Sequence, residues 1–238
     1  MPVLYATHPR FLDHDTGAGH PERPARLRAV ESGIDVAGLR EALVPVVPQP
    51  VAAADLVRVH PAPFTDALAA FCERGGGYLD GDTHVGPASW EAARLAAGAG
   101  LSVIEALDAG LGEVGFCAVR PPGHHATPTR AMGFCLLNNV AVAARALTAR
   151  GERVAVVDYD AHHGNGTQDV FWSDPDVFYV SLHQFPMYPG TGRLDEVGEG
   201  AGRGTTLNLP FPAHATGDGY RRAIDEVVVP ALAAWGVT

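Results

Sequence analysis

The chain has 238 residues, of which 47% are hydrophobic, so it is long enough and apolar enough to bury a sizeable core. This composition excludes a disordered or collagen-like chain. The formal net charge is −10, from 17 basic and 27 acidic residues, and no run of basic residues could follow a phosphate backbone or an anionic lipid surface. We therefore expect no direct nucleic acid partner and no membrane partner.

The cysteines and the start of the chain indicate where the protein resides. Cys72, Cys117 and Cys135 are odd in number and too widely spaced for a disulfide framework, which favours a reducing compartment. The start lacks the basic residues and the apolar run of about 7 to 15 residues that a secretory signal requires. No uncharged apolar stretch of about 18 residues follows. A cytoplasmic location is therefore predicted.

Short β-rich segments alternate with longer alanine-rich segments that have helical spacing. In chain order the predicted elements are strand 3–6, helix 24–34, helix 89–107, strand 114–119, helix 136–150, strand 153–159, strand 177–182, strand 205–210 and helix 219–235. Ser89 is the predicted N-cap of its helix. This alternation is typical of a parallel sheet that helices cover on both faces, so the predicted fold class is α/β.

Glycine and proline cluster in four loops between these elements, at 75–82, 120–128, 185–193 and 198–204. Ligands of open α/β sheets bind where strands end in such loops. No internal repeat and no Ser/Gly linker divides the sequence, so we expect a single domain over residues 1–238. The last predicted helix ends where a parallel sheet would ordinarily receive another strand, and we therefore expect an incomplete chain.

A string of polar residues, D-x-D-x-H-H-G-N-G at 158–166, follows one of the buried strands. Asp160 and His162 are two residues apart, as oxygen and nitrogen ligands of one cation can be in an extended segment, and Zn²⁺ accepts both at about 2.0 to 2.2 Å. Alternatively, Asp158 and Asp160 cap a turn and the two histidines are ordinary loop residues. The two turn glycines favour the metal site because they hold the loop tightly where the polar groups converge.

A second motif, RPPGHHA, contains the adjacent histidines His124 and His125. Adjacent imidazoles can divide acid and base roles between them, provided that a partner fixes the tautomer of each ring. Asp158 and Asn165 are the acceptors that the first motif offers. The alternative is a surface turn without chemistry, which the occurrence of both motifs in one chain disfavours.

Five motifs together resemble one family in content and order: HxTGxGHPERPxRL at 14–27, RPPGHHA at 120–126, GFCLLNN at 133–139, DYDAHHGNGTQ at 158–168, and SLHQ with YPGTG within 181–192. They are similar to the motifs of the zinc-dependent histone deacetylase superfamily, which includes bacterial acetylpolyamine amidohydrolases and acetoin-utilisation deacetylases. Asn165 and the double proline resemble the class II branch. The resemblance implies an arginase-like α/β/α sandwich of three layers with a central, mostly parallel sheet.

The resemblance also implies catalytic roles. Asp160 and His162 correspond to two of three zinc ligands, with one zinc per site. His124 corresponds to the histidine paired with Asp158, and His125 to the one paired with Asn165. Between them these histidines take a proton from the zinc-bound water and deliver one to the leaving amine.

Further residues are assigned by the resemblance to substrate and potassium. Phe134 and Tyr188 would wall the channel for an acylated aliphatic amine, and Gly133 belongs to the same substrate-binding segment. Asp82 corresponds to a rim carboxylate, and Arg26 to an arginine of an internal channel beneath the metal. A structural potassium site is implied by these residues: Asp158, Asp160, His162, Ser181 and Leu182.

Two functional residues of the family have no counterpart here. The third zinc ligand, an aspartate, and the tyrosine that hydrogen-bonds the substrate carbonyl would follow the last residue. Asp195, Glu196 and Asp218 are the nearest carboxylates, but none follows a buried strand, so we do not expect them to substitute. The chain is therefore expected to be the N-terminal two-thirds of the family's domain, with weak activity or none by itself.

The predicted function is a zinc-dependent amidohydrolase that removes acetyl groups from acetyl-lysine in proteins or from acetylpolyamines. Potassium and a homo-oligomer are compatible with it. One alternative is a manganese ureohydrolase of the arginase type, which is disfavoured because His163 stands where a second bridging aspartate is expected. The other is a non-catalytic binding module with a truncated deacetylase fold, which is favoured by the missing residues and disfavoured by the intact motifs.

Overall fold

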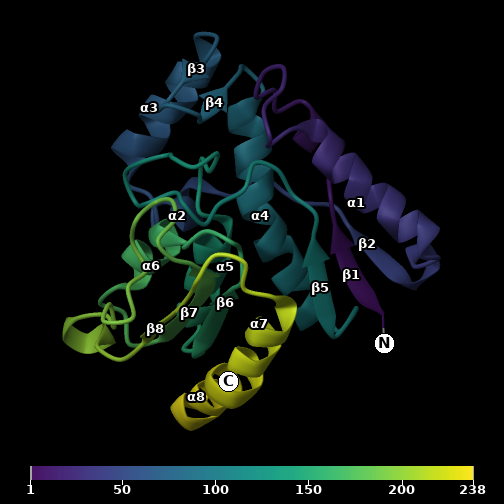
Figure 1. Cartoon of the computed structure of the whole chain (residues 1–238). Helices are drawn as coiled ribbons and strands as arrows, with labels where there is room; N and C mark the ends of the chain where they lie inside the picture. Colours follow the sequence, from purple (N-terminus) through teal and green to yellow (C-terminus); the bar gives the residue numbers. More distant parts are fainter. Residues whose placement is uncertain (1, 238) are drawn as a thin grey trace. The chain divides into compact units, whose positions relative to one another are not determined.

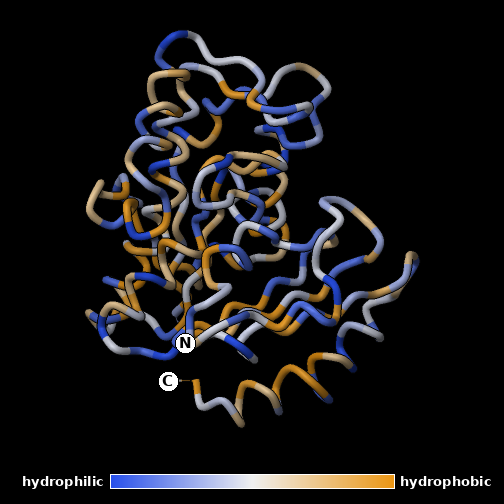
Figure 2. Tube along the Cα trace, turned by 90° about the vertical axis from the view of Figure 1, so that its left-hand side faces the viewer, coloured by the Kyte–Doolittle hydropathy of each residue, from blue (hydrophilic) through white to orange (hydrophobic). Residues whose placement is uncertain are grey.

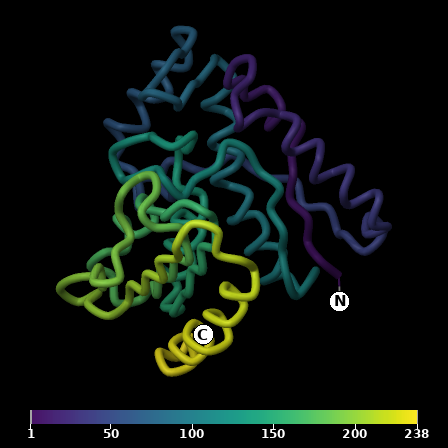
Figure 3. The backbone as a smooth tube through the Cα atoms, in the orientation of Figure 1, coloured from purple at the N-terminus to yellow at the C-terminus, as the bar shows by residue number. Residues whose placement is uncertain are grey.

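A computed structural model gives the structure of this protein and describes residues 2–237. The chain divides into two compact units, Met1–Ala143 and Ala144–Thr238, which are described separately below as the first and second unit. Figure 3 follows the backbone from the purple N-terminal segment through teal and green to the yellow C-terminal helices. In each unit a parallel sheet is combined with helices (Figure 1), so the α/β fold class is confirmed.

The first unit is built on a parallel sheet of three strands in the order β2-β1-β5. Its elements are β1 (Val3–Ala6), η1 (Pro9–Leu12), α1 (Pro24–Val36), η2 (Arg40–Ala42), β2 (Leu43–Val46), α2 (Ala53–Leu56), α3 (Ala62–Glu73), the hairpin of β3 (Gly77–Tyr78) and β4 (His84–Val85), α4 (Ser89–Asp108), β5 (Val114–Cys117) and α5 (Asn139–Thr148), which continues into the second unit. Side chains alternate along β1, so Tyr5 packs in one apolar cluster with α1 and α4, while Leu4 and Ala6 pack in another with α4. The central strand is therefore buried on both faces.

The second unit contains a parallel sheet in the order β6-β7-β8. Its elements are β6 (Val154–Asp158), α6 (Asn165–Phe171), β7 (Val177–Gln184), η3 (Gly200–Gly202), β8 (Thr206–Phe211), α7 (Gly217–Ala223), the π-helical turn η4 (Ile224–Val228) and α8 (Val229–Trp235). Phe178, Val180 and Leu182 of β7 pack against apolar residues of the last helical segment. In Figure 2 this segment alternates between orange and blue residues, as an amphipathic helix does.

All five predicted strands form, and the four long predicted helices form with shifted ends. The structure adds the strands β2, β3 and β4, the helices α2, α3 and α6, and the short segments η1, η2 and η3. Strand β2 was not predicted because it contains Pro45, and proline cannot donate a hydrogen bond to a β-ladder. An edge strand tolerates proline, and β2 lies at the edge of its sheet.

The predicted N-cap at Ser89 is wrong. Ala88 precedes the helix and Ser89 is its first residue, with its Oγ accepting from the backbone N–H of Gly86 at 2.8 Å. The Ser89 side chain thus serves the preceding turn instead of the helix end. Within residues 2–237, none of the helices is both long and apolar enough to cross a membrane.

Candidate metal and acid-base site

The predicted histidine pair follows a buried arginine in the motif RPPGHHA. Arg120 donates from Nε to Glu22 Oε1 at 2.6 Å and from Nη2 to Glu22 Oε2 at 2.8 Å, so the two groups form a two-point ion pair. The guanidinium also donates to the carbonyl oxygens of Phe11 and His14, at 2.6 and 3.1 Å. These contacts tie the start of the motif to the loop that precedes α1.

His124 and His125 lie side by side, with ring centroids 4.0 Å apart and planes inclined by 44°. His125 is buried and His124 is half-buried. Gly133 borders the buried ring, because a Cβ at that position would lie 2.4 Å from Cδ2 of His125. Glycine at 133 is therefore required for the observed ring position.

The predicted partners of this pair, Asp158 and Asn165, belong to the second unit. Asp158 is the last residue of β6, and Asn165 is the first residue of α6. The pairing of His124 with Asp158 and of His125 with Asn165 stays a prediction.

The segments assigned to substrate in the first unit contact one another. Phe134 donates its backbone N–H to Thr83 Oγ1 at 3.0 Å, and its ring lies edge-on to His20, with centroids 4.6 Å apart. Nε2 of His20 lies 2.8 Å from the carbonyl oxygen of Asp82. The Asp82 side chain is largely exposed. A slight loss of solvation and the neighbouring Asp80 carboxylate both raise the pKa of its carboxyl.

Arg26 lies exposed in the first turns of α1. Its assignment to an internal channel stays a prediction. The arginine that is buried among the residues of this unit is Arg120.

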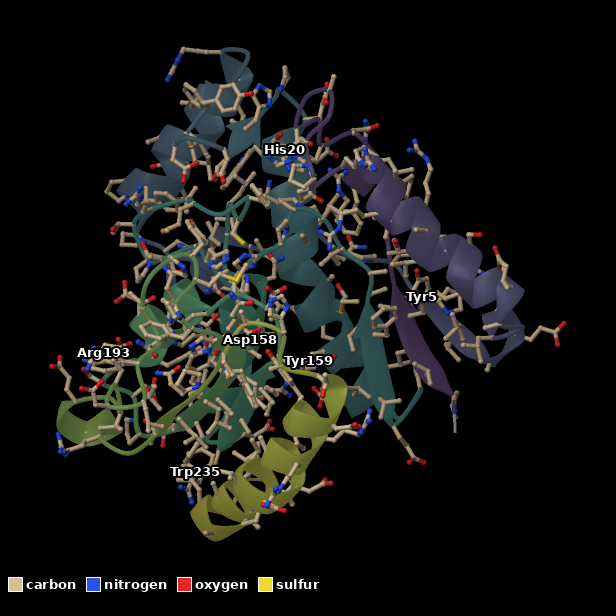
Figure 4. All side chains as sticks on the ribbon, viewed as in Figure 1. Tyr5, His20, Asp158, Tyr159, Arg193 and Trp235 are labelled. Atoms are coloured by element: carbon tan, nitrogen blue, oxygen red, sulfur yellow. The ribbon has the colours of Figure 1, made fainter. Side chains whose placement is uncertain are left out.

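In the second unit, the predicted zinc ligands converge just past the end of β6. Nδ1 of His162 lies 3.2 Å from Oδ1 of Asp160, and the backbone N–H of His162 donates to the same oxygen at 2.8 Å. The backbone N–H of Asp160 in turn donates to Oδ1 of Asp158, labelled in Figure 4, at 3.1 Å. An oxygen and a nitrogen that could bind a metal ion thus lie close together on an accessible loop. The side chain of Asp160 is 51% exposed and that of His162 is 38% exposed.

This donor pair fits two positions of a zinc site in chemistry and in proximity. Among residues 2–237, however, no group of three or more His, Cys, Asp or Glu side chains is arranged to hold a metal ion. The three carboxylates considered as substitutes are engaged elsewhere. Asp195 pairs with Arg193 at 2.9 Å, Asp218 pairs with Arg221, and Glu196 accepts from Gln168 and from the backbone N–H of Gly192.

Tyr188 lies beside the donor pair. Its ring is edge-on to His162, with centroids 6.0 Å apart and planes inclined by 80°. The ring is partly exposed. Its position next to a predicted zinc ligand is compatible with contact to a substrate.

Three of the five residues assigned to potassium lie on adjacent strands, and the other two, Asp160 and His162, lie in the loop after β6. Asp158 of β6 is in register with Ser181 of β7, and Leu182 follows Ser181. Both β7 residues are fully buried. The potassium site stays a prediction.

His163, the neighbour of His162, belongs to a buried network. Its Nδ1 lies 2.8 Å from Thr191 Oγ1 and its Nε2 lies 3.0 Å from Gln168 Oε1. Burial, reinforced by the nearby His183, lowers the pKa of His163 to about 4, so the ring is neutral at pH 7. The two histidines of this motif therefore differ: His162 is an accessible candidate metal ligand, and His163 is a hydrogen-bonded core residue.

Sequence reasoning missed three residues that hold the first-unit segments in place: Glu22, Thr83 and Arg120. The signal was present, since Glu22 and Arg120 stand inside two of the quoted motifs and Thr83 follows Asp82. What the motifs did not indicate is that Glu22 and Arg120, 98 positions apart, form one buried ion pair.

The fold and these side chains define an α/β protein with candidate ligand residues at the carboxyl ends of its parallel strands. The model of the histone deacetylase domain matches residues 20–236. A histone deacetylase-like amidohydrolase of Pseudomonas aeruginosa is 44% identical over 227 residues, which are 93% of this chain and 59% of that protein. A probable deacetylase of Archaeoglobus fulgidus is 38% identical over 231 residues, which are 94% of this chain and 63% of that protein.

Among solved structures, the crystal structure of the HDA15 HD domain superposes with a TM-score of 0.93 at 39% identity, covering 99% of this chain and 71% of that one. The chain belongs to the histone deacetylase domain family, and its fold is the arginase/deacetylase-like α/β fold. It spans 59% and 63% of the two curated relatives described above.

Proposed function

We propose that this chain supplies the histidine pair and two of the zinc ligands of a zinc-dependent deacetylase that hydrolyses acetylated aliphatic amines. The observation that carries the proposal is the convergence of Asp160 Oδ1 and His162 Nδ1, 3.2 Å apart, on an accessible loop of a chain that also holds adjacent imidazoles. Family membership supports it, and relatives named as deacetylases and amidohydrolases agree with this chemistry.

Asp160 and His162 would hold the zinc ion, which when bound polarises an acyl carbonyl and makes a water molecule more acidic. A ring nitrogen of His125 accepts the proton of the attacking water, and a ring nitrogen of the histidine pair returns a proton to the leaving amine nitrogen. His125 is buried, so its ring has little access to bulk water. The proton that the ring accepts therefore stays near the reacting groups.

The two rings need different partners to divide these roles. In our proposal Asp158 accepts a hydrogen bond from His124, and Asn165 accepts one from His125. A carboxylate stabilises a charged imidazole and an amide does so less, so His124 is the more basic ring of the pair.

The substrate proposal is an acetamide on an aliphatic stem, as in acetyl-lysine or an acetylpolyamine. Phe134 and Tyr188 offer aromatic surface for the stem, and the exposed Asp82 offers a carboxylate for an amide N–H or a cationic group. A potassium ion at Asp158, Ser181 and Leu182, a cytoplasmic location and a homo-oligomer remain parts of the same proposal.

The test is zinc content and turnover of the complete protein, assayed on an acetyl-lysine peptide and on an acetylpolyamine. We expect Asp160→Asn and His162→Ala to lose zinc by elemental analysis and to lose turnover. His125→Ala is expected to keep zinc but to lose about 10²- to 10⁴-fold in kcat, the usual contribution of a general base.

The matched control is Asp195→Asn, an exposed carboxylate on the same unit that pairs only with Arg193 among the side chains described. It is expected to keep both zinc and turnover. Zinc binding without turnover on either substrate would favour the binding-module alternative. Full turnover of Asp160→Asn would contradict the assigned ligand.

A further inference from the structure

A tight turn lies between the candidate catalytic histidine and the loop that carries Asp82. Met132 and Cys135 exchange two backbone hydrogen bonds, at 3.1 and 3.0 Å, across Gly133 and Phe134. Both central residues have positive φ, +56° and +68°, which is the pattern of a type I′ turn. Glycine adopts this conformation freely, whereas phenylalanine rarely does. The turn is therefore strained at Phe134 and must be held by its surroundings.

One side-chain hydroxyl contacts the backbone of this strained turn. Thr83 Oγ1 accepts the backbone N–H of Phe134 at 3.0 Å. Thr83 is itself buried and fixed, since its backbone N–H donates to Oδ1 of Asp80 at 2.7 Å. The Thr83 hydroxyl is thus fixed within its own loop, and the strained Phe134 is hydrogen-bonded to it.

The Phe134 ring is held by His20, a residue that contacts the same loop. It packs edge-on against His20, with centroids 4.6 Å apart and planes inclined by 76°. His20, labelled in Figure 4, lies with Nε2 2.8 Å from the carbonyl oxygen of Asp82. Residues 80–83 therefore constrain the backbone of Phe134 directly, and its side chain through His20.

The other side of the turn touches the histidine. A Cβ at Gly133 would lie 2.4 Å from Cδ2 and 2.8 Å from Cγ of His125, so the turn backbone is packed directly on that ring. Protein interiors are close-packed, and a small displacement on one side of such a contact is transmitted to the other. The position of the turn therefore sets the position of the His125 ring.

We propose that Thr83 is a positioning residue: its hydroxyl holds the strained turn of residues 132–135, and the turn fixes the His125 ring and the Phe134 side chain. The catalytic meaning rests on the proposed function, in which His125 moves protons and Phe134 contacts the substrate. The claim that the Thr83 hydroxyl holds the turn does not depend on the proposed function, because it rests on the contacts of the turn.

The test compares Thr83→Val, which keeps the shape but removes the acceptor, with Thr83→Ser, which keeps the hydroxyl. Hydrogen exchange at the Phe134 amide is expected to be at least about tenfold faster in Thr83→Val and close to wild type in Thr83→Ser. In the zinc-loaded complete protein, Thr83→Val is expected to lower kcat and to raise KM, and Thr83→Ser to restore both. A merely structural threonine would lower the amount of folded protein and leave kcat per folded molecule unchanged.

Two further variants keep the test decisive. Thr83→Ala is measured in parallel, so that a folded variant without the hydroxyl is available. Gly133→Ala leaves the Thr83 hydroxyl in place and pushes on His125 directly, and it is expected to lower kcat.

The matched control is Thr65→Val, which removes another buried threonine hydroxyl of the same unit, one that donates to the carbonyl oxygen of Ala62 in α3. It is expected to leave Phe134 exchange and kinetics unchanged. Wild-type exchange at Phe134 in folded Thr83→Val or Thr83→Ala, or wild-type kcat in Gly133→Ala, would overturn the proposal. If the wild-type protein hydrolyses no acyl amide, the proposed function fails, and the exchange measurement still decides whether Thr83 holds the turn.

Discussion

At the residue scale, the first unit is organised around charged and polar groups that are removed from water. Arg120 and Glu22 neutralise each other there, and His14 lies against them, with Nε2 3.6 Å from Glu22 Oε2. Breaking a buried pair by removing one partner leaves an uncompensated charge and costs about 3 to 5 kcal/mol. The motifs that resemble the family thus carry structural residues as well as candidate catalytic ones.

His14 leads to a prediction about pH. Burial lowers the pKa of His14 to about 4 from its ordinary 6.5, with Glu22 acting in the opposite direction and Arg120, His20 and His84 adding to the lowering. The folded state therefore binds this proton more weakly than the unfolded state. The free energy of unfolding should fall as pH falls from about 6.5 to about 4, by about 1.4 kcal/mol for each unit of lowered pKa.

Urea unfolding of His14→Gln across this pH range checks the prediction. Glutamine can keep a hydrogen bond to Ser89, whose Oγ lies 2.8 Å from Nδ1 of His14, but it does not titrate. We expect a shallower loss of stability toward acid than in the wild type. The exposed His214→Gln is the control and should retain the wild-type slope, and an unchanged slope in His14→Gln would count against the assignment.

At the scale of elements, hydrophobic periodicity predicted the parts that matter for the candidate site. Strand β7 is buried along nearly its whole length, and a continuous apolar run is what such a strand requires. Strand β2 and helices α2 and α6 were missed because a short or proline-containing segment carries little periodic signal. Helix α3 was missed although its 12 residues are amphipathic and Pro63 lies in its first turn, where proline favours a helix start. Helix α6 was also masked by the glycines that surround Asn165.

The last helical segment provides a prediction of stability. Val228 lies in the π-helical turn, is 2% exposed and packs against Phe178, Val180 and Leu182. Val228→Ala deletes buried methyl groups and should lower the free energy of unfolding by about 1 to 3 kcal/mol. The measurement is the urea midpoint at unchanged slope.

Its neighbour Val227 is the matched control, because the same chemical change is made in a side chain that is 40% exposed. Val227→Ala should shift stability by about 0.5 kcal/mol or less. Equal effects of the two variants would mean that this segment does not pack as described.

At the scale of the whole molecule, each unit has its own parallel sheet and its own apolar clusters. The prediction of a single domain over residues 1–238 stays a prediction. In the first unit, β5 lies at one end of the sheet and exposes Val114 and Phe116, each 47% exposed. An apolar strand at a sheet edge is a template for association.

We therefore expect the 238-residue chain to self-associate through β5. Val114→Lys places a charge on this strand and should shift the population toward monomer in size exclusion with light scattering. The control is Val36→Lys, which changes a valine that is 87% exposed at the end of α1. Association that responds equally to both substitutions, or to neither, would contradict a role for β5.

The sequence by itself determined the α/β class, the five strands and the proximity of Asp160 to His162, because these depend on alternation along a strand and on a spacing of two residues. Only the tertiary structure decided that Glu22 meets Arg120, that Thr83 holds Phe134 and that Gly133 packs on His125. Each of these pairs joins loops that are distant in sequence or that fold back on one another. The physical reason is that periodicity is a local property of the chain, whereas the partner of a buried polar group depends on which loops the packed sheets and helices bring together.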